Sequence, residues 1–180
     1  MEEIEAPIEQ VQEVINHHAH ESKETWIGNV ALTSALLAVL AAVTALLSAD
    51  HANEAMIEQI QASDHWGYYQ AKGIKAAVLG GKIEMLGSLG KLVSEKDEQK
   101  LESYKKDQEE ISEKAKEKEH SSESHLKHHV IFARGVTMFQ VAIGIAAISI
   151  LTRRRRFFYL GLGFSLAGLL FLVQGLLLHV

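Results

Sequence analysis

The sequence predicts an all-α integral membrane protein, with three transmembrane helices and a long extramembrane helical hairpin between the first and the second. Three observations support this fold class. Apolar residues gather in three blocks, and charged residues fill the gaps between the blocks. The 180 residues include one proline, which favours long uninterrupted helices because proline breaks them. A sustained alternation of apolar and polar residues, the pattern of a half-buried strand, is absent from the sequence.

The three apolar blocks are long enough to cross a membrane. Residues 26–49 contain no charged residue, residues 130–152 contain only Arg134, and residues 157–180 contain none if His179 is neutral. As a helix, the 24 residues of the first block rise about 36 Å, whereas the hydrocarbon core of a bilayer is roughly 30 Å thick. We therefore predict one transmembrane helix in each block.

Four consecutive arginines separate the second block from the third: Arg153, Arg154, Arg155 and Arg156. One arginine at the centre of a bilayer costs about 2.5–3.5 kcal/mol, so this loop must lie at a membrane surface. Because short positive loops stay in the cytoplasm, residues 153–156 and the N-terminus are predicted to be cytoplasmic, and residues 50–129 extracytoplasmic. The twelve lysines of residues 50–129 do not oppose this topology, since loops longer than about 60 residues translocate largely regardless of charge.

Residues 1–25 are predicted to form an amphipathic acidic helix. Ile4, Ile8, Val11 and Ile15 recur at helical spacing, and Pro7 is allowed in a first turn. The acidic opposite face suits a protein partner better than anionic lipid. A cleaved signal peptide is the competing interpretation of the first apolar block. Its acidic flank and its length argue instead for an uncleaved membrane anchor.

Small residues mark one face of the first predicted span. Six alanines follow one another at intervals of four and three residues, the coiled-coil period that keeps one face toward a partner helix. They are Ala31, Ala35, Ala38, Ala42, Ala45 and Ala49, here called the alanine seam. In lipid, such small residues let helix backbones approach closely. The alternative is that alanine is merely common in membrane helices.

The stretch QASDHWGYYQAKGIKA, residues 61–76, is unusually rich in aromatic and amide side chains. Counting on from the alanine seam places Trp66 on the same face and Tyr69 beside it, which predicts a helix that continues out of the bilayer. These side chains are expected to contact a neighbouring helix. A catalytic alternative rests on Asp64 and Tyr68, which could meet across one helical turn, but no catalytic motif surrounds them.

Residues 94–124 interleave charges of both signs and carry a thin apolar stripe at heptad-like spacing, formed by Leu101, Tyr104, Ile111 and Ala115. We predict a solvated helix that returns to the membrane, with a disordered linker as the alternative. The turn before it is predicted near the glycines at positions 80, 81, 87 and 90.

Five histidines are predicted to share the outer membrane surface: His51, His125, His128, His129 and His179. His125 and His129 are four residues apart on one helix face, a spacing that can ligate zinc or copper. The hypothesis is an outer metal site or proton sensor, and the alternative is that these histidines are simply solvated. No cofactor other than zinc or copper at this site is expected. Inside the spans, Gln140 and Gln174 could line a pore in an oligomer.

The stretch HANEAMIEQIQASDHWGYYQAKGIK at residues 51–75, with the acidic start and the terminal hairpin, resembles a bacterial membrane-protein family catalogued as domain of unknown function 4337. The resemblance extends over nearly the whole chain. It implies placement in a bacterial membrane, which together with the predicted spans and arginine loop gives a multi-pass protein of the inner, or cytoplasmic, membrane. It implies no activity and no catalytic residue.

These observations favour a structural or scaffolding protein that self-associates as a homo-oligomer through the alanine seam and residues 61–75. The rival interpretation is a small oligomeric channel or a metal- or pH-responsive membrane protein built from the same oligomer. The lipid bilayer is the other expected partner. Enzymatic activity and nucleic-acid binding are not expected.

Overall fold

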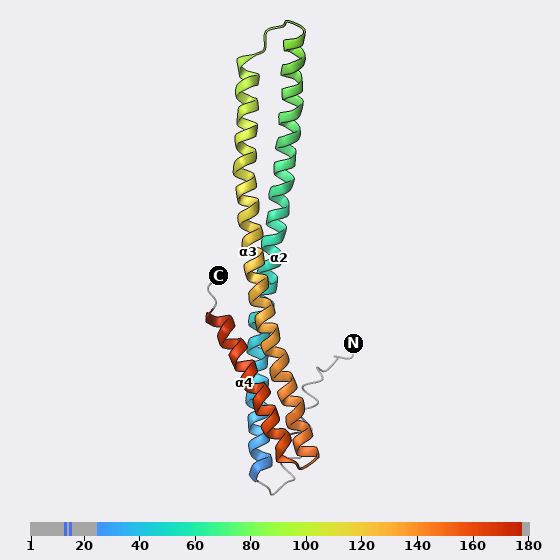
Figure 1. Ribbon diagram of the computed structural model, residues 1–180, viewed down its shortest axis with the longest axis vertical. Coiled ribbons are helices and arrows are strands. Elements are labelled where there is room, and N and C mark those ends of the chain that lie inside the picture. The colour runs from blue at the N-terminus through green and yellow to red at the C-terminus, as the bar shows by residue number, and fades with distance from the viewer. Residues whose placement is uncertain (1–12, 14, 16–24, 178–180) are drawn as a thin grey trace. The chain divides into compact units, whose positions relative to one another are not determined.

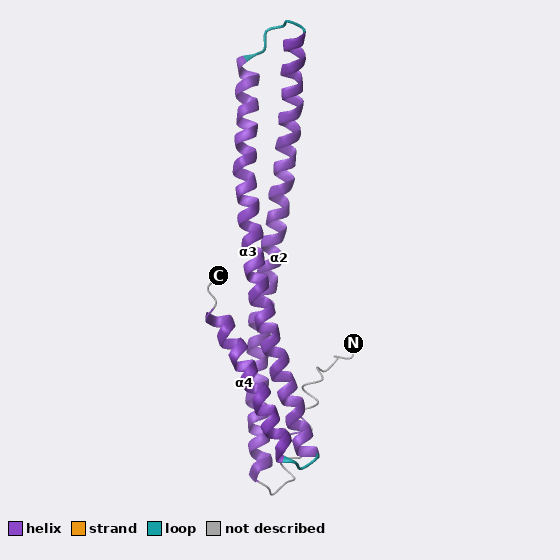
Figure 2. Ribbon diagram, in the orientation of Figure 1, coloured by secondary structure: helices purple, strands orange, loops and turns teal. Residues whose placement is uncertain are grey.

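The computed structural model describes residues 13, 15 and 25–177, and all three elements from residue 25 onward are α-helices (Figures 1 and 2). They are α2 (Thr25–Ser88), α3 (Glu95–Leu151) and α4 (Arg155–Leu177). The all-α prediction is confirmed for the described residues. The helix predicted at residues 1–25 lies almost wholly outside them.

Two of the helices are much longer than a membrane requires. α2 has 64 residues and α3 has 57, so they extend over about 96 Å and 86 Å, whereas a span needs about 20 residues. Each of α2, α3 and α4 contains a segment long and apolar enough, by length and composition, to cross a membrane. The charged segment 95–124 is helical as part of α3, so the disordered-linker alternative is wrong.

Both helix-to-helix turns use the same capping geometry. After α2, the amide of Lys91 donates to Leu86 O at 2.9 Å, the amide of Gly90 donates to Gly87 O at 3.0 Å, and Gly90 has a φ of 66°. This is the Schellman motif, in which a left-handed residue ends the helix. Of the four glycines predicted near the turn, Gly90 makes it, while the glycines at 80, 81 and 87 remain inside α2.

The second turn places an arginine where the first places a glycine. The amide of Arg154 donates to Ser149 O and that of Arg153 to Ile150 O, each at 3.1 Å, and Arg153 has a φ of 52°. A side chain in this left-handed conformation costs about 1 kcal/mol or more. α4 begins at Arg155, so the predicted loop 153–156 is shorter than expected and its last two arginines belong to the helix.

The chain divides into two compact units. The three-helix unit comprises residues 1–52 and 126–180, and therefore the start of α2, the end of α3 and all of α4. The hairpin unit comprises residues 53–125, in which α2 and α3 lie side by side (Figure 1).

The core of the three-helix unit is a cluster of buried aliphatic side chains around Phe139. From α2 it contains Ile27, Val30, Leu37 and Ala41, among others, and Ile15 is fully buried in the same cluster. Buried positions on α2 recur at intervals of three and four residues because that spacing keeps one helix face toward its neighbour. The buried face passes through Val30, Ser34, Leu37, Ala41, Thr44 and Ser48.

The alanine seam is displaced by one residue from this buried face. Ala31 is buried and Ala38 half-buried, whereas the remaining four alanines are exposed. A shift of one residue rotates a position by about 100° around a helix. Most of the seam is therefore not covered by α3 or α4 of the same chain. Among the described residues, no helix packs along the whole seam as the predicted partner.

Glycines bring α4 close to α3. A Cβ atom at position 168 would lie 2.7 Å from the Phe139 ring, and one at position 175 would lie 2.5 Å from the Phe132 ring. Both distances are too short for a real contact, so the two phenylalanine rings occupy space that only glycine leaves open. A Cβ atom at position 161 would lie 3.2 Å from the Ala142 carbonyl oxygen, which is also a tight contact. Small residues that allow such backbone approach are the usual means of packing helices in lipid.

Three buried hydroxyl groups of the three-helix unit are satisfied by their own helices. Thr44 Oγ1 donates to Leu40 O at 2.6 Å, Ser149 Oγ to Ala146 O at 2.7 Å, and Ser165 Oγ to Leu162 O at 2.8 Å. A buried hydroxyl without a partner costs free energy, and this local bonding removes the cost without a second helix or water. These residues are compatible with an apolar environment for that reason.

The glycine packing predicts a clear difference between two alanine substitutions on α4. Gly168→Ala should destabilise the protein by about 1–3 kcal/mol, because the new methyl group overpacks against Phe139. The measurement is thermal unfolding of the purified chain in detergent, followed by circular dichroism.

Gly163→Ala is the matched control, since nothing lies within 4 Å of a Cβ at that position. It should be neutral or stabilising, because alanine has the higher helix propensity by about 1 kcal/mol. Equal melting temperatures for the two variants would contradict the packing of α4 on α3.

Candidate functional site

In the three-helix unit, His51 of α2 meets His128 of α3. His128 is only 2% exposed and stacks on His51 with ring centroids 4.8 Å apart and planes inclined by 23°. The ring of His51 also stacks on Phe132 at 5.6 Å. Phe132 is the ring that Gly175 accommodates, so this histidine layer is continuous with the packing of α4.

His129 joins α3 to α2 through two hydrogen bonds with one serine. The Nδ1 atom of His129 lies 2.9 Å from Ser48 O, and because a carbonyl can only accept, Nδ1 carries the proton in this contact. Ser48 Oγ donates to His129 O at 3.1 Å. The bond from Nδ1 fixes the orientation of the His129 ring, and the two bonds together join α2 to α3 at this position.

The structure brings together part of the predicted metal cluster. His51, His128 and His129 lie within the three-helix unit, His125 belongs to the hairpin unit, and His179 lies outside the described residues. No group of three or more histidine or carboxylate side chains in the described residues is placed to hold a metal ion. The lone pair of an imidazole lies in the ring plane, so the stacked rings of His51 and His128 do not converge on one ion. The five-histidine site stays a prediction.

The hairpin unit contains the aromatic stretch that the sequence singles out. Trp66 Nε1 donates to Glu119 Oε1 at 2.8 Å, and the rings of Trp66 and Tyr69 meet edge to face with centroids 5.4 Å apart. Gln108 Nε2 donates to Tyr69 O at 3.3 Å and fills the space above Gly73, where a Cβ would lie 2.7 Å away. Trp66 and Tyr69 thus face α3 of the same chain.

Alanines and ion pairs hold the hairpin unit together. Ala62 and Ala115 are completely buried, and buried Ser122 donates to Ala55 O at 2.8 Å. Three lysines pair with carboxylates across the two helices. The pairs are Lys118 with Glu58 at 2.9 Å, and Lys72 with Asp107 and Lys82 with Asp97, each at 2.6 Å. The apolar stripe predicted on α3 lies on this inner face, with Ala115 buried and Leu101, Tyr104 and Ile111 half-buried.

A family model described as a domain of unknown function, DUF4337, matches residues 26–178. The chain belongs to this family. The match confirms the family resemblance that the aromatic stretch and the terminal hairpin indicate. No curated protein and no solved structure matches the DUF4337 chain.

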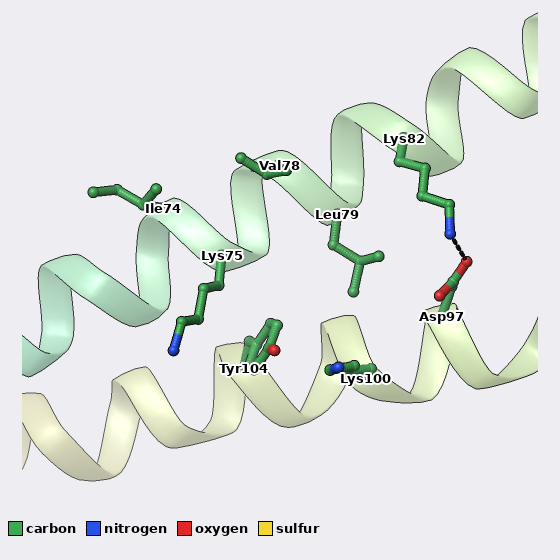
Figure 3. Close-up of a pocket in the computed structure, with 8 residues that line it drawn as sticks. All are labelled: Ile74, Lys75, Val78, Leu79, Lys82, Asp97, Lys100 and Tyr104. Carbon is green, nitrogen blue, oxygen red and sulfur yellow. Dashed lines mark hydrogen bonds and ion pairs between the residues drawn. The ribbon is translucent and has the colours of Figure 1, made fainter.

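The DUF4337 chain has an open groove between the two helices of the hairpin unit (Figure 3). Its volume is about 310 Å³, and its lining combines apolar side chains with three lysines and one carboxylate. These residues are Ile74, Lys75, Val78, Leu79, Lys82, Asp97, Lys100 and Tyr104. Lys82 is held by Asp97, and Lys100 lies over the Tyr104 ring at 5.9 Å. The groove is basic and apolar but contains no nucleophile beside a general base.

Other predicted polar residues of the DUF4337 chain are dispersed. Asp64 and Tyr68 are exposed on α2, and His65 is half-buried beside them. Gln140 and Gln174 are exposed on α3 and α4, so neither points into the three-helix unit. A pore lined by these two glutamines would therefore require further copies of the chain.

Removal of one indole hydrogen bond tests the geometry of the hairpin unit. Trp66→Phe keeps an aromatic ring but loses the bond to the carboxylate of Glu119, which should cost about 1.5–3 kcal/mol of stability because one partner is charged. The free energy of unfolding of the hairpin helices in denaturant is the quantity to measure.

Tyr68→Phe serves as the comparison, since Tyr68 is 65% exposed and its hydroxyl has no partner in the described residues. It should change the stability by less than about 0.5 kcal/mol. Similar losses for both variants would show that Trp66 does not donate across the hairpin.

Proposed function

We propose that this DUF4337 protein is a structural, self-associating protein of the bacterial inner membrane. In this proposal it crosses the bilayer with residues 26–49, 130–152 and 157–180, the arginine turn is cytoplasmic, and residues 50–129 are extracytoplasmic. The proposal is supported by three apolar helical segments of sufficient length and by the distribution of exposed apolar side chains described below.

Large apolar side chains cover the outside of α2 in the three-helix unit. Leu32, Leu36, Val39 and Leu46 are each about 60% exposed. Apolar surface in water costs about 25 cal/mol per Å², and a continuous surface of this kind is unusual on a water-soluble protein. Hydrocarbon around the three-helix unit removes that cost, which supports insertion in a bilayer.

The main support for self-association comes from the surface of the hairpin unit, which the proposal places outside the bilayer. One exposed face of α2 there carries a row of large apolar side chains, two of which, Ile74 and Val78, also line the groove. They are Met56, Ile60, Ile74, Val78 and Met85, here called the outer stripe, and each is between 56% and 70% exposed. Lipid does not reach this region in the proposed topology, so a protein partner is the occupant that would bury the stripe.

α3 of the same unit provides the contrast. No large apolar side chain between Glu95 and His125 is exposed, and its outer face carries lysines and glutamates instead. The two helices of the hairpin therefore have different outer surfaces, one solvated and one apolar. A second copy of the chain fits this asymmetry, because two outer stripes related by a twofold axis bury each other and leave both α3 faces in water.

Small residues on α2 of the three-helix unit support the same arrangement. Four alanines of the seam, Ala35, Ala42, Ala45 and Ala49, remain exposed in the single chain. They would allow α2 of a second copy to approach closely within the bilayer. The scaffold interpretation thus uses apolar faces that packing within the chain leaves uncovered.

Charge on the outer stripe should separate the copies. The double variant Ile74→Glu with Val78→Glu places like charges in the contact, which costs several kcal/mol across a buried interface. The oligomeric mass of the chain in detergent, measured by light scattering, should fall from a multiple of the monomer mass to the monomer mass.

The control changes two solvated residues of α3 by the same chemistry, Lys114→Glu with Lys116→Glu, and should leave the oligomeric mass unchanged. A wild-type chain that is already monomeric in detergent and in native lipid would contradict self-association. So would an oligomer that survives the change at positions 74 and 78.

A further inference from the structure

The four arginines between α3 and α4 have no carboxylate partner in the described part of the chain. The lysine–carboxylate pairs among these residues lie in the hairpin unit, and no ion pair there involves Arg153, Arg154, Arg155 or Arg156. The first turn of α4 also contains no acidic residue. Four positive charges in four consecutive residues repel one another, so a bound anion would stabilise this turn.

Three of the arginines lie around an open depression on the protein surface. Arg154, Arg155 and Arg156 are all exposed and line an open surface depression of about 550 Å³. Each guanidinium group offers five N–H donors in a planar fork that fits a phosphate with two parallel hydrogen bonds. The site therefore has the donors and the space for a phosphate group.

An aromatic ring orients the central guanidinium. The Arg155 guanidinium carbon lies 5.5 Å from the centroid of the Trp26 ring. A cation–π contact uses the face of the guanidinium and leaves its N–H edges available to an acceptor. Trp26 begins the first apolar segment, and tryptophan at that position is typical of the level at which lipid headgroups lie.

The backbone of Arg153 gives a further indication. Its φ of 52° is the conformation that Gly90 adopts in the equivalent turn after α2. An arginine at a position where glycine would be less strained suggests that the charge has a use there.

We infer that this arginine turn binds the phosphate of an anionic glycerophospholipid. The inference rests on the proposed membrane placement and deepens it. A lipid fits better than free phosphate because exposed apolar side chains adjoin the arginines, with Tyr159 66% and Leu160 53% exposed at the start of α4. These residues offer an acyl chain a surface next to the phosphate site.

The test is native mass spectrometry of the full chain in detergent, after equilibration with equal amounts of phosphatidylglycerol and phosphatidylcholine. The wild type should retain phosphatidylglycerol preferentially. Each single change to glutamine, at Arg154, Arg155 or Arg156, should lower the ratio of bound phosphatidylglycerol to phosphatidylcholine by about fivefold. The triple change to lysine keeps the charge but loses the fork, so it should lower the ratio less than the triple change to glutamine.

Lys116→Gln is the control, because Lys116 is exposed on α3 in the hairpin unit, outside the bilayer in the proposed topology, and it should leave the ratio unchanged. Equal retention of the two lipids by the wild type would overturn the inference. So would loss of phosphatidylglycerol on addition of inorganic phosphate, since the site would then take free phosphate.

The same spectra report the number of copies of the chain. An intact oligomer without lipid preference would contradict the lipid site but not self-association. A monomer that prefers phosphatidylglycerol would contradict self-association and leave the lipid site standing.

Discussion

The separation of apolar from charged residues along the chain is the constraint on which the rest of the structure depends. With one proline in 180 residues, nothing interrupts the helices, so each long helix carries an apolar segment and a charged segment in one continuous element. Several hydroxyls inside the three-helix unit are bonded to their own helix, and Ser48 bonds across to His129 of α3. The apolar segments can therefore lie in hydrocarbon without an unpaired side chain, whereas the arginine turn cannot.

The two units solve the same packing problem with different chemistry. In the three-helix unit, glycines receive phenylalanine rings, a contact that works without water because it depends on shape and dispersion. In the hairpin unit, completely buried alanines bring α2 and α3 together and lysine–carboxylate pairs flank them. Half-exposed ion pairs contribute little stability, about 0–1 kcal/mol each, so they serve chiefly to fix which residues of the two helices face each other.

Much of this architecture can be predicted from sequence because composition alone distinguishes apolar, charged and helix-permitting segments. Helix rotation is harder to predict, as the alanine seam shows. Alanine fits an exposed and a buried face equally well, and the buried face proved to lie one residue away. A stronger signal was available in Phe132 and Phe139, which are seven residues apart, as are Gly168 and Gly175. The stacking of His51 on His128 could not be predicted, since it depends on how two segments far apart in sequence align.

Membrane topology is the central claim, and the absence of cysteine makes it directly measurable. Leu92, in the turn of the hairpin, is 99% exposed, so a cysteine placed there is accessible from the compartment that holds the hairpin. The measurement is reaction of the Leu92→Cys variant with a membrane-impermeant maleimide in cells whose inner membrane is intact. The account predicts labelling before lysis. Labelling only after the inner membrane is broken would place the hairpin in the cytoplasm and contradict the account.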